Sequence, residues 1–213
     1  MNFHFTVDET HTNNANEYYR DAKRLQISSG VFSLVLLLAA VLMLVFLDHT
    51  PWIIGGAIVV LAIAVLYIGV TFQIKRQIKE PQELYDSSPL VPAMIAEVNE
   101  RTMTLMALVD TRKNPSQGLP QRALTIRTVT AVSGAPRRVG APVPAVAVGG
   151  AHKTRADYYD EVTPVPLSWS TRDASVIRKA EQAITGVEWN LLKANLDRVE
   201  EVRSTKRDLL IIS

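Results

Sequence analysis

The chain has 213 residues, of which 47% are hydrophobic and 21% charged, and its formal net charge is +2. It contains no cysteine, which excludes thiol nucleophiles, disulfides, Cys-ligated zinc, iron–sulfur clusters, covalent c-type haem and Cys-linked lipid anchors. The near-neutral charge argues against a nucleic-acid-binding protein, which usually carries a strong basic excess. Residues 25–47 and 52–74 hold no charge, so we expect one membrane hairpin and one modest domain.

Residues 1–24 are predicted to form a cytoplasmic N-terminal arm. Apolar and polar residues alternate over Phe3–Val7, which is typical of a short half-buried strand. Thr6 or Asp8 can begin a helix over Glu9–Arg24 that runs into the first apolar segment.

His4, Asp8 and His11 have the spacing of one helical face, which makes them candidate metal ligands. A metal site needs three or four converging ligands, and His4 lies in the strand-like part. We therefore expect a solvated arm and no metal site.

Leu25–Leu47 and Trp52–Ile74 are predicted transmembrane helices. Each has 23 residues, or about 34 Å of helix, enough to span a hydrocarbon core of roughly 30 Å. Buried helices of a soluble protein would need a polar stripe, which neither segment has. A signal peptide is disfavoured by the length of the first segment, its lack of a small-x-small cleavage pattern and the second span that follows.

Basic residues flank the hairpin, while the loop Asp48–Pro51 has no Lys or Arg. The positive-inside rule predicts a two-pass protein of the cell (plasma) membrane with both termini in the cytoplasm. The predicted membrane-interface anchors are Arg20, Lys23, Arg24, Trp52, Tyr67, Lys75, Arg76 and Lys79.

Small residues recur at a seven-residue spacing and define three helix faces. These are Gly55, Ala62 and Gly69 on one face of the second span, Ala57 and Ala64 on another, and Ser33 and Ala40 on the first span. Small residues allow close helix approach inside a bilayer. They indicate packing within the hairpin, docking onto a larger membrane protein, or both. No ionisable residue lies in either span, so nothing indicates an ion or proton path.

Residues 75–89 are predicted to be a linker, because prolines and serines punctuate them, and residues 90–213 a cytoplasmic α+β domain. Five strand-like runs are Leu90–Asn99, Thr102–Asp110, Ala123–Val132, Pro142–Val148 and Glu161–Trp169. The last two contain prolines, which suit edge strands. Five short strands with turn signals predict a small, closed or partly open β-barrel-like sheet.

Two helices are expected after the sheet. Ser170 or Thr171 can cap the first, over Arg172–Ile184, and the second covers Val187–Thr205. The second has an apolar stripe of Trp189, Leu192, Leu196 and Val199, which is expected to pack on the barrel or, alternatively, to dock a partner. The apolar tail Leu209–Ile212 can return to the sheet as a final strand, beside Phe3–Val7.

No chemical motif is complete. Ala145–Thr154 ends in Lys-Thr after two glycines, but His152 and Ala147 occupy positions where a phosphate loop needs glycine. There is no Gly-x-Ser-x-Gly elbow, and nothing supports a triad built on His152 and Asp157. We therefore predict no catalytic residue, cofactor or metal site, and not an enzyme.

Two charged groups remain open in interpretation. Asp157, Asp160 and Glu161 could bind a cation, although a solvated loop is the commoner outcome. Five basic residues on predicted loops either contact anionic lipid headgroups, at roughly 1 kcal/mol each, or are ordinary surface charge. They are Arg112, Lys113, Arg122, Arg137 and Arg138.

The strings LVPAMIAEVN, TLMALVDT, ALTIRTVT, VGAPVPAVAVGG, PVPLSW and STKRDLL, together with the hairpin, resemble a functionally uncharacterised family of two-span membrane proteins from actinobacteria. By size and type, the chain is also similar to accessory subunits of the actinobacterial respiratory supercomplex of cytochrome bcc and cytochrome oxidase. That resemblance implies a subunit for assembly or stabilisation. Because the chain has no cysteine and no histidine in its spans, such a subunit would bind no haem through a span histidine and carry no electrons. The predicted function is a non-catalytic accessory subunit of a larger membrane complex. The alternative is a membrane-tethered module that binds a ligand, lipid or nucleic acid.

Overall fold

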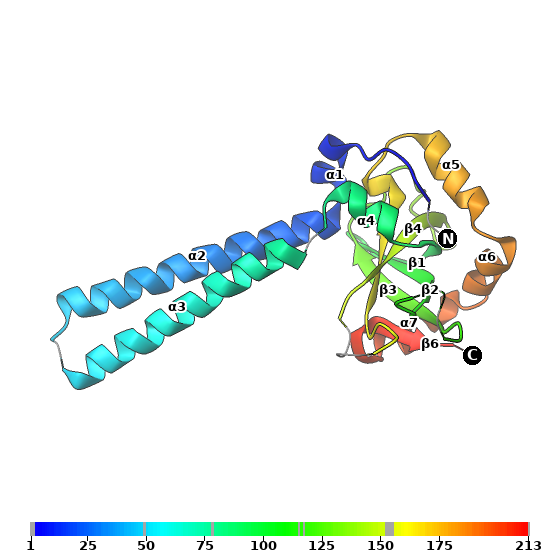
Figure 1. Ribbon diagram of the computed structural model, residues 1–213. Helices are drawn as coiled ribbons and strands as arrows, with labels where there is room; N and C mark the ends of the chain where they lie inside the picture. The colour runs from blue at the N-terminus through cyan, green and yellow to red at the C-terminus, as the bar shows by residue number, and fades with distance from the viewer. Residues whose placement is uncertain are drawn as a thin grey trace. The chain divides into compact units, whose positions relative to one another are not determined.

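The computed structural model describes residues 3–48, 50–77, 79–114, 116, 118–151 and 156–212, with the backbone alone at 74–77. The chain divides into two compact units (Figure 1). The hairpin unit is Tyr18–Lys79, and the globular unit combines Met1–Glu17 with Glu80–Ser213.

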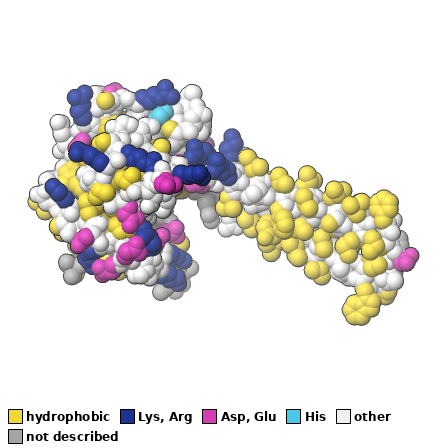
Figure 2. Space-filling view, turned by 180° about the vertical axis from the view of Figure 1, so that it is seen from behind, with side chains coloured by type: hydrophobic (Ala, Val, Ile, Leu, Met, Phe, Trp, Pro, Cys, Tyr) yellow, Lys and Arg dark blue, Asp and Glu magenta, His cyan; other side chains and the backbone are white. Residues whose placement is uncertain are grey.

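The hairpin consists of α2 (Glu17–Phe46) and α3 (Pro51–Gln77). Both helices are long and apolar enough to cross a membrane, and only 17% and 11% of their most apolar windows are buried. Helices of a soluble core would be mostly buried, so the membrane hairpin predicted from sequence is confirmed. Figure 2 shows hydrophobic side chains along the hairpin surface. At the start of α3, the backbone carbonyl of Thr50 accepts hydrogen bonds from the backbone N–H groups of Ile53 and Ile54.

The N-terminal arm differs from its prediction. The helix α1 (Glu9–Ala15) begins at Asp8, whose carboxylate accepts from the His11 N–H, but it ends at Asn16 rather than continuing into α2. Phe3–Val7 is not a strand. Its backbone forms hydrogen bonds with a side chain instead, since the Gln82 amide accepts from the Val7 N–H and donates to the Phe5 carbonyl.

The predicted linker 75–89 contains a helix, α4 (Pro81–Ser87), which corrects that boundary. Pro81 occupies the first helical position, where the missing N–H costs nothing. Leu84 and Tyr85 are fully buried and fix α4 to the globular unit. The prolines and serines that suggested a linker therefore mark the two ends of a short helix.

The six strands of the globular unit form one antiparallel sheet, in the order β5-β4-β1-β2-β3-β6. Their bounds are β1 Leu90–Val98, β2 Met103–Asp110, β3 Arg122–Val129, β4 Pro142–Gly149, β5 Val162–Pro166 and β6 Leu209–Ile211. All five predicted strands are present. The tail does return as β6, but it pairs with β3 and not with Phe3–Val7.

The sheet curls into a half-barrel. The Thr125 hydroxyl of β3 donates to the Val162 carbonyl of β5 at 2.8 Å, although these strands are not neighbours in the sheet. The curl places β5 across the concave face, where Leu105 and Val109 of β2 are buried. The predicted fold class, a hairpin followed by an α+β domain with a partly open barrel-like sheet, is confirmed.

The strand β4 lies inside the sheet, so the edge-strand prediction was wrong for it and right only for β5. The Ala147 N–H donates to the Pro89 carbonyl, so the backbone N–H and C=O groups of the odd-numbered residues of β4 point toward β1. Pro142 and Pro144 alternate with these residues, so their backbone nitrogens point to the β5 side. They lie beyond Ala145, where the pairing with β5 stops. Their missing N–H groups remove no ladder hydrogen bond.

Three helices, rather than the predicted two, follow β5. They are α5 (Ala174–Ala183), α6 (Gly186–Lys193) and α7 (Val199–Arg203), with a 3₁₀ turn Leu196–Arg198 before α7. The cap of α5 is Asp173 and not Ser170 or Thr171, which are buried. The predicted apolar stripe is confirmed, because Leu192 and Val199 pack with Met94, Met106 and Leu124 on the convex face.

Candidate functional site

Two of the three small-residue faces, one on each helix, are buried in the hairpin. Ser33 and Ala40 of α2 and Ala57 and Ala64 of α3 are all buried. The Ser33 hydroxyl donates to the Ala64 carbonyl at 3.1 Å. A small residue lets the backbone carbonyl approach a neighbouring helix in this way.

The other small-residue face, Gly55, Ala62 and Gly69, is exposed on α3. A Cβ atom built at Gly55 or Gly69 would meet nothing within 4 Å. Gly56, which the sequence reasoning missed, is the glycine that packs inside the hairpin, since its Cβ would lie 3.2 Å from the Met43 methyl carbon.

The predicted interface anchors take different positions. Trp52 at the start of α3 is 90% exposed, and Arg20, Lys23 and Arg24 lie in the first turns of α2. Tyr67 packs edge-on against Phe32, with ring centroids 4.9 Å apart. Lys79 is exposed, and its carbonyl accepts from the Tyr19 hydroxyl at 2.9 Å. The side chains of Lys75 and Arg76 lie outside the described residues, as does His49 of the loop.

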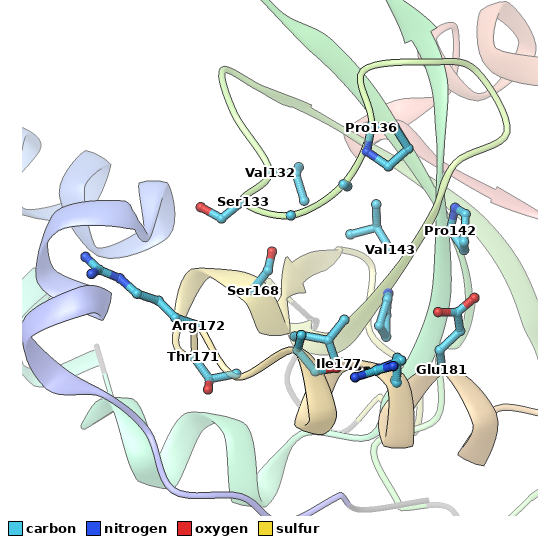
Figure 3. A pocket seen from close by; sticks show the side chains of 15 residues that line it. Val132, Ser133, Pro136, Pro142, Val143, Ser168, Thr171, Arg172, Ile177 and Glu181 are labelled. Atoms are coloured by element: carbon cyan, nitrogen blue, oxygen red, sulfur yellow. Dashed lines mark hydrogen bonds between the residues drawn. The ribbon is translucent and has the colours of Figure 1, made fainter.

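The globular unit has a pocket of about 480 Å³ (Figure 3), which no sequence motif indicated. It lies between the loop 132–136, the first residues of β4 and the helix α5. Its walls are mainly apolar and include Val132, Pro136, Pro142, Val143, Pro144 and Ile177. The volume lies within the range of roughly 300–1,000 Å³ that small-molecule sites occupy.

Ser168 lines this pocket and is only 7% exposed. Among the described residues, its Oγ has no hydrogen-bond partner. Ser168 lies in the 3₁₀ turn Leu167–Trp169, and in Figure 3 its hydroxyl points from this turn toward the space between Val132 and Val143. A buried hydroxyl without a partner costs about 1–3 kcal/mol, so a group in the pocket that bonds to it would be stabilised.

Charged groups lie around this pocket. The guanidinium of Arg172 leads away toward α1, where its Nε donates to the His11 ring at 3.1 Å. The other His11 nitrogen bonds to the Ser168 carbonyl at 2.9 Å. Arg178 and Glu181 on α5 also line the pocket and carry opposite charges. The rim therefore shows no strong charge preference.

The candidate metal face of the arm is divided between separate contacts. His4 bonds to Asp86 at 2.8 Å, Asp8 caps α1, and His11 is buried against Ser168 and Arg172. No group of three possible ligands forms within the described part of the chain.

A buried polar group fixes the arm to the sheet. The Asn16 amide donates to the Tyr85 hydroxyl at 3.2 Å, and that hydroxyl donates to the Pro166 carbonyl at 3.0 Å. Burial raises the pKa of the Tyr85 phenol, so it remains a hydrogen-bond donor at any physiological pH. The Glu17 carboxylate accepts from the backbone N–H groups of Thr130 and Ala131.

The glycine pair of the incomplete phosphate-loop motif makes room for the Tyr159 ring and the Glu161 side chain. A Cβ on Gly149 would lie 2.4 Å from the Tyr159 ring, and one on Gly150 would lie 3.2 Å from the Glu161 side chain. Residues 152–155, including His152, lie outside the described residues. In the acidic group, Asp160 lies 3.7 Å from Arg207.

Two of the loop arginines have partners within the protein. Arg112 forms an ion pair with Asp110 at 2.6 Å and also donates to the Gly118 carbonyl. Arg137 donates to the carbonyls of Asn99 and Thr102. Their guanidinium groups therefore stabilise the backbone of loops that connect strands of the sheet.

The Asp110–Arg112 pair predicts a pH effect. Partial burial alone would raise the pKa of Asp110, but hydrogen bonds from Arg112 outweigh it and the pKa lies below its usual value. A carboxyl group whose pKa is lower in the folded than in the unfolded protein stabilises the fold at pH values above its unfolded pKa of about 4. This stabilisation is lost as the pH falls through the folded-state pKa. We expect Asp110→Asn to lower the urea midpoint more at pH 7 than at pH 2.5. An equal loss at both pH values would contradict this.

Comparison with known proteins places the chain in a family. The family model for proteins of unknown function called DUF3239 matches residues 76–200, more than half of the chain. The structure is similar to a crystal structure described as that of "a putative membrane protein from Corynebacterium diphtheriae", with 45% sequence identity and a TM-score of 0.55. That match covers 58% of this chain and 100% of the other. No curated protein matches. The chain belongs to the DUF3239 family of proteins of unknown function.

Proposed function

We propose that this membrane protein is a non-catalytic accessory subunit that docks on a larger membrane complex and stabilises it or helps to assemble it. The docking face is Gly55, Ala62 and Gly69 on α3, and both termini lie in the cytoplasm. The observation that carries the proposal is the difference between the two small-residue faces. Ala57 and Ala64 are buried in the hairpin, while the docking face is exposed.

Small residues on a lipid-facing surface have a cost, because they bury little area and expose the backbone of α3. Their value in membranes is close helix approach, which allows dispersion contacts that large side chains would block. The exposed face has the same seven-residue spacing as the face that closes the hairpin. A partner helix could therefore approach α3 on this side as α2 does on the other.

The partner class proposed here is an assembly of the actinobacterial membrane, with the cytochrome bcc–oxidase supercomplex as the first candidate. The similarity to a protein from Corynebacterium diphtheriae supports the actinobacterial origin of the family. The absence of cysteine and of histidine within the spans fits a subunit that carries no haem.

The docking face is tested by the triple variant Gly55→Leu, Ala62→Leu and Gly69→Leu. The three side chains would separate the helix backbones by the width of a leucine, so co-purification of the partner in mild detergent should fall at least tenfold. The matched control is Ile58→Leu, Val59→Leu and Val65→Leu, which changes exposed residues of the same helix that are already large. Equal recovery of partner with both variants would refute the docking face.

A further inference from the structure

We propose that the globular unit binds an acyl chain in the pocket between α5 and β4, with the acyl carbonyl oxygen accepting a hydrogen bond from the Ser168 hydroxyl. This site is separate from the docking face of the hairpin. It does not depend on the proposed function.

The chemistry of the walls favours a hydrocarbon occupant. Most side chains that the loop 132–136 and the start of β4 contribute to the lining cannot form hydrogen bonds; Ser133 is the exception, and α5 adds the apolar Ile177. A polar metabolite would lose hydration against these apolar walls. An acyl chain loses only unfavourable contact with water.

The polar feature that selects among apolar molecules is Ser168. It is more than nine-tenths buried, its hydroxyl points into the pocket (Figure 3), and it has no hydrogen-bond partner among the described residues. A ligand with one accepting oxygen satisfies this group, whereas a pure hydrocarbon leaves it unsatisfied. At the pocket, Arg178 and Glu181 carry opposite charges, and the third charged residue, Arg172, donates to the His11 ring. The carbonyl, rather than net charge, is therefore the recognised group.

The open β4 edge explains why a pocket exists here. Pro142 and Pro144 face the side of β4 where the β5 pairing has ended, and neither offers an N–H group to another strand. The helix α5 covers this edge. Because α5 contributes Ala174, Ile177 and Arg178 to the lining, the space lies between helix and sheet and is not a sheet-pairing site.

The experiment is photolabelling of the full-length protein in phosphatidylglycerol nanodiscs. A twelve-carbon fatty acid with a diazirine in its chain is added in one arm. Phosphatidylglycerol carrying the same photoreactive chain replaces part of the bilayer in the other. Labelled peptides are located by mass spectrometry, and excess dodecanoate is the competitor in the first arm.

We expect competed labels within residues 132–144 and 168–181. Labelling by the free acid alone identifies a fatty acid as the ligand, and labelling by the photoreactive lipid identifies a bilayer acyl chain. Labels confined to residues 18–79 in both arms would overturn the proposal.

Two variants separate binding from folding. Ala174→Trp, at an exposed position that lines the pocket, should remove the competed labels, whereas Lys179→Trp on the same helix but outside the lining should not. Ser168→Ala breaks no hydroxyl hydrogen bond within the described protein, so the unit should fold normally. It should raise the dodecanoate concentration needed for competition about 3–10-fold. Unchanged competition in Ser168→Ala, or unchanged labelling in Ala174→Trp, would contradict the site.

Discussion

Replacing Trp169 with alanine is expected to unfold the globular unit under conditions in which the unaltered protein is folded. Trp169 is fully buried, its Nε1 donates to the Ala131 carbonyl at 2.9 Å, and the Arg127 guanidinium lies 5.0 Å from its ring centroid. Removing a buried tryptophan typically costs about 3–5 kcal/mol. Whole domains are often stable by only about 5–15 kcal/mol.

Hydrogen exchange of the β1–β3 peptides at increasing urea concentration measures this loss, because the hairpin in detergent does not contribute to those peptides. The control is Trp52→Ala, which removes an exposed ring of the hairpin and should leave the midpoint unchanged. Trp169→Phe should fall between the two, since it keeps a ring beside Arg127 and loses the indole N–H. A midpoint for Trp169→Ala equal to that of Trp52→Ala would show that the ring does not hold the half-barrel together.

Membrane topology should give an all-or-none result with single cysteines, because the natural chain has none. Thr50→Cys lies in the hairpin loop, and Leu119→Cys lies at an 82% exposed position of the globular unit. If both termini are cytoplasmic, as the flanking basic residues predict, an impermeant maleimide should label only Thr50→Cys in intact cells. Leu119→Cys should be labelled only after permeabilisation. The opposite pattern would place the globular unit outside.

The sequence was most informative where one physical requirement acts over many residues. Uncharged segments as long as 25–47 and 52–74 are required by the hydrocarbon core, and the structure has α2 and α3 there. The apolar stripe of the second predicted helix survives in α6 and α7, although Asn195 and a 3₁₀ turn interrupt the helix, because the residues still face one side.

The predictions that were wrong concern segments whose structure is fixed by tertiary contacts. The helix α4 is seven residues long, too short to show periodicity, and is fixed by the burial of Leu84 and Tyr85. Phe3–Val7 alternates like a strand, but Gln82 takes the hydrogen bonds that a neighbouring strand would have provided. No local pattern predicts a partner far along the chain.

The pocket could not be predicted for the same reason. Its lining comes from three segments that are apart in the sequence, and Ser168 lies in the string PVPLSW, which reads as the end of a strand. In the structure the strand stops at Pro166, and a 3₁₀ turn directs the serine into the pocket. The small-residue spacing was easier to interpret, yet only the structure separates the buried Ala57 and Ala64 from the exposed Gly55 and Gly69.

The accessory-subunit proposal is tested most directly by extracting the unaltered protein from its native membrane in mild detergent through a C-terminal tag. The mass of the particle and its visible absorbance are then read together. The account predicts a large assembly with the tagged chain in fixed proportion, and haem bands in that assembly would identify the respiratory supercomplex as the partner. A monodisperse particle containing this chain alone would contradict the account.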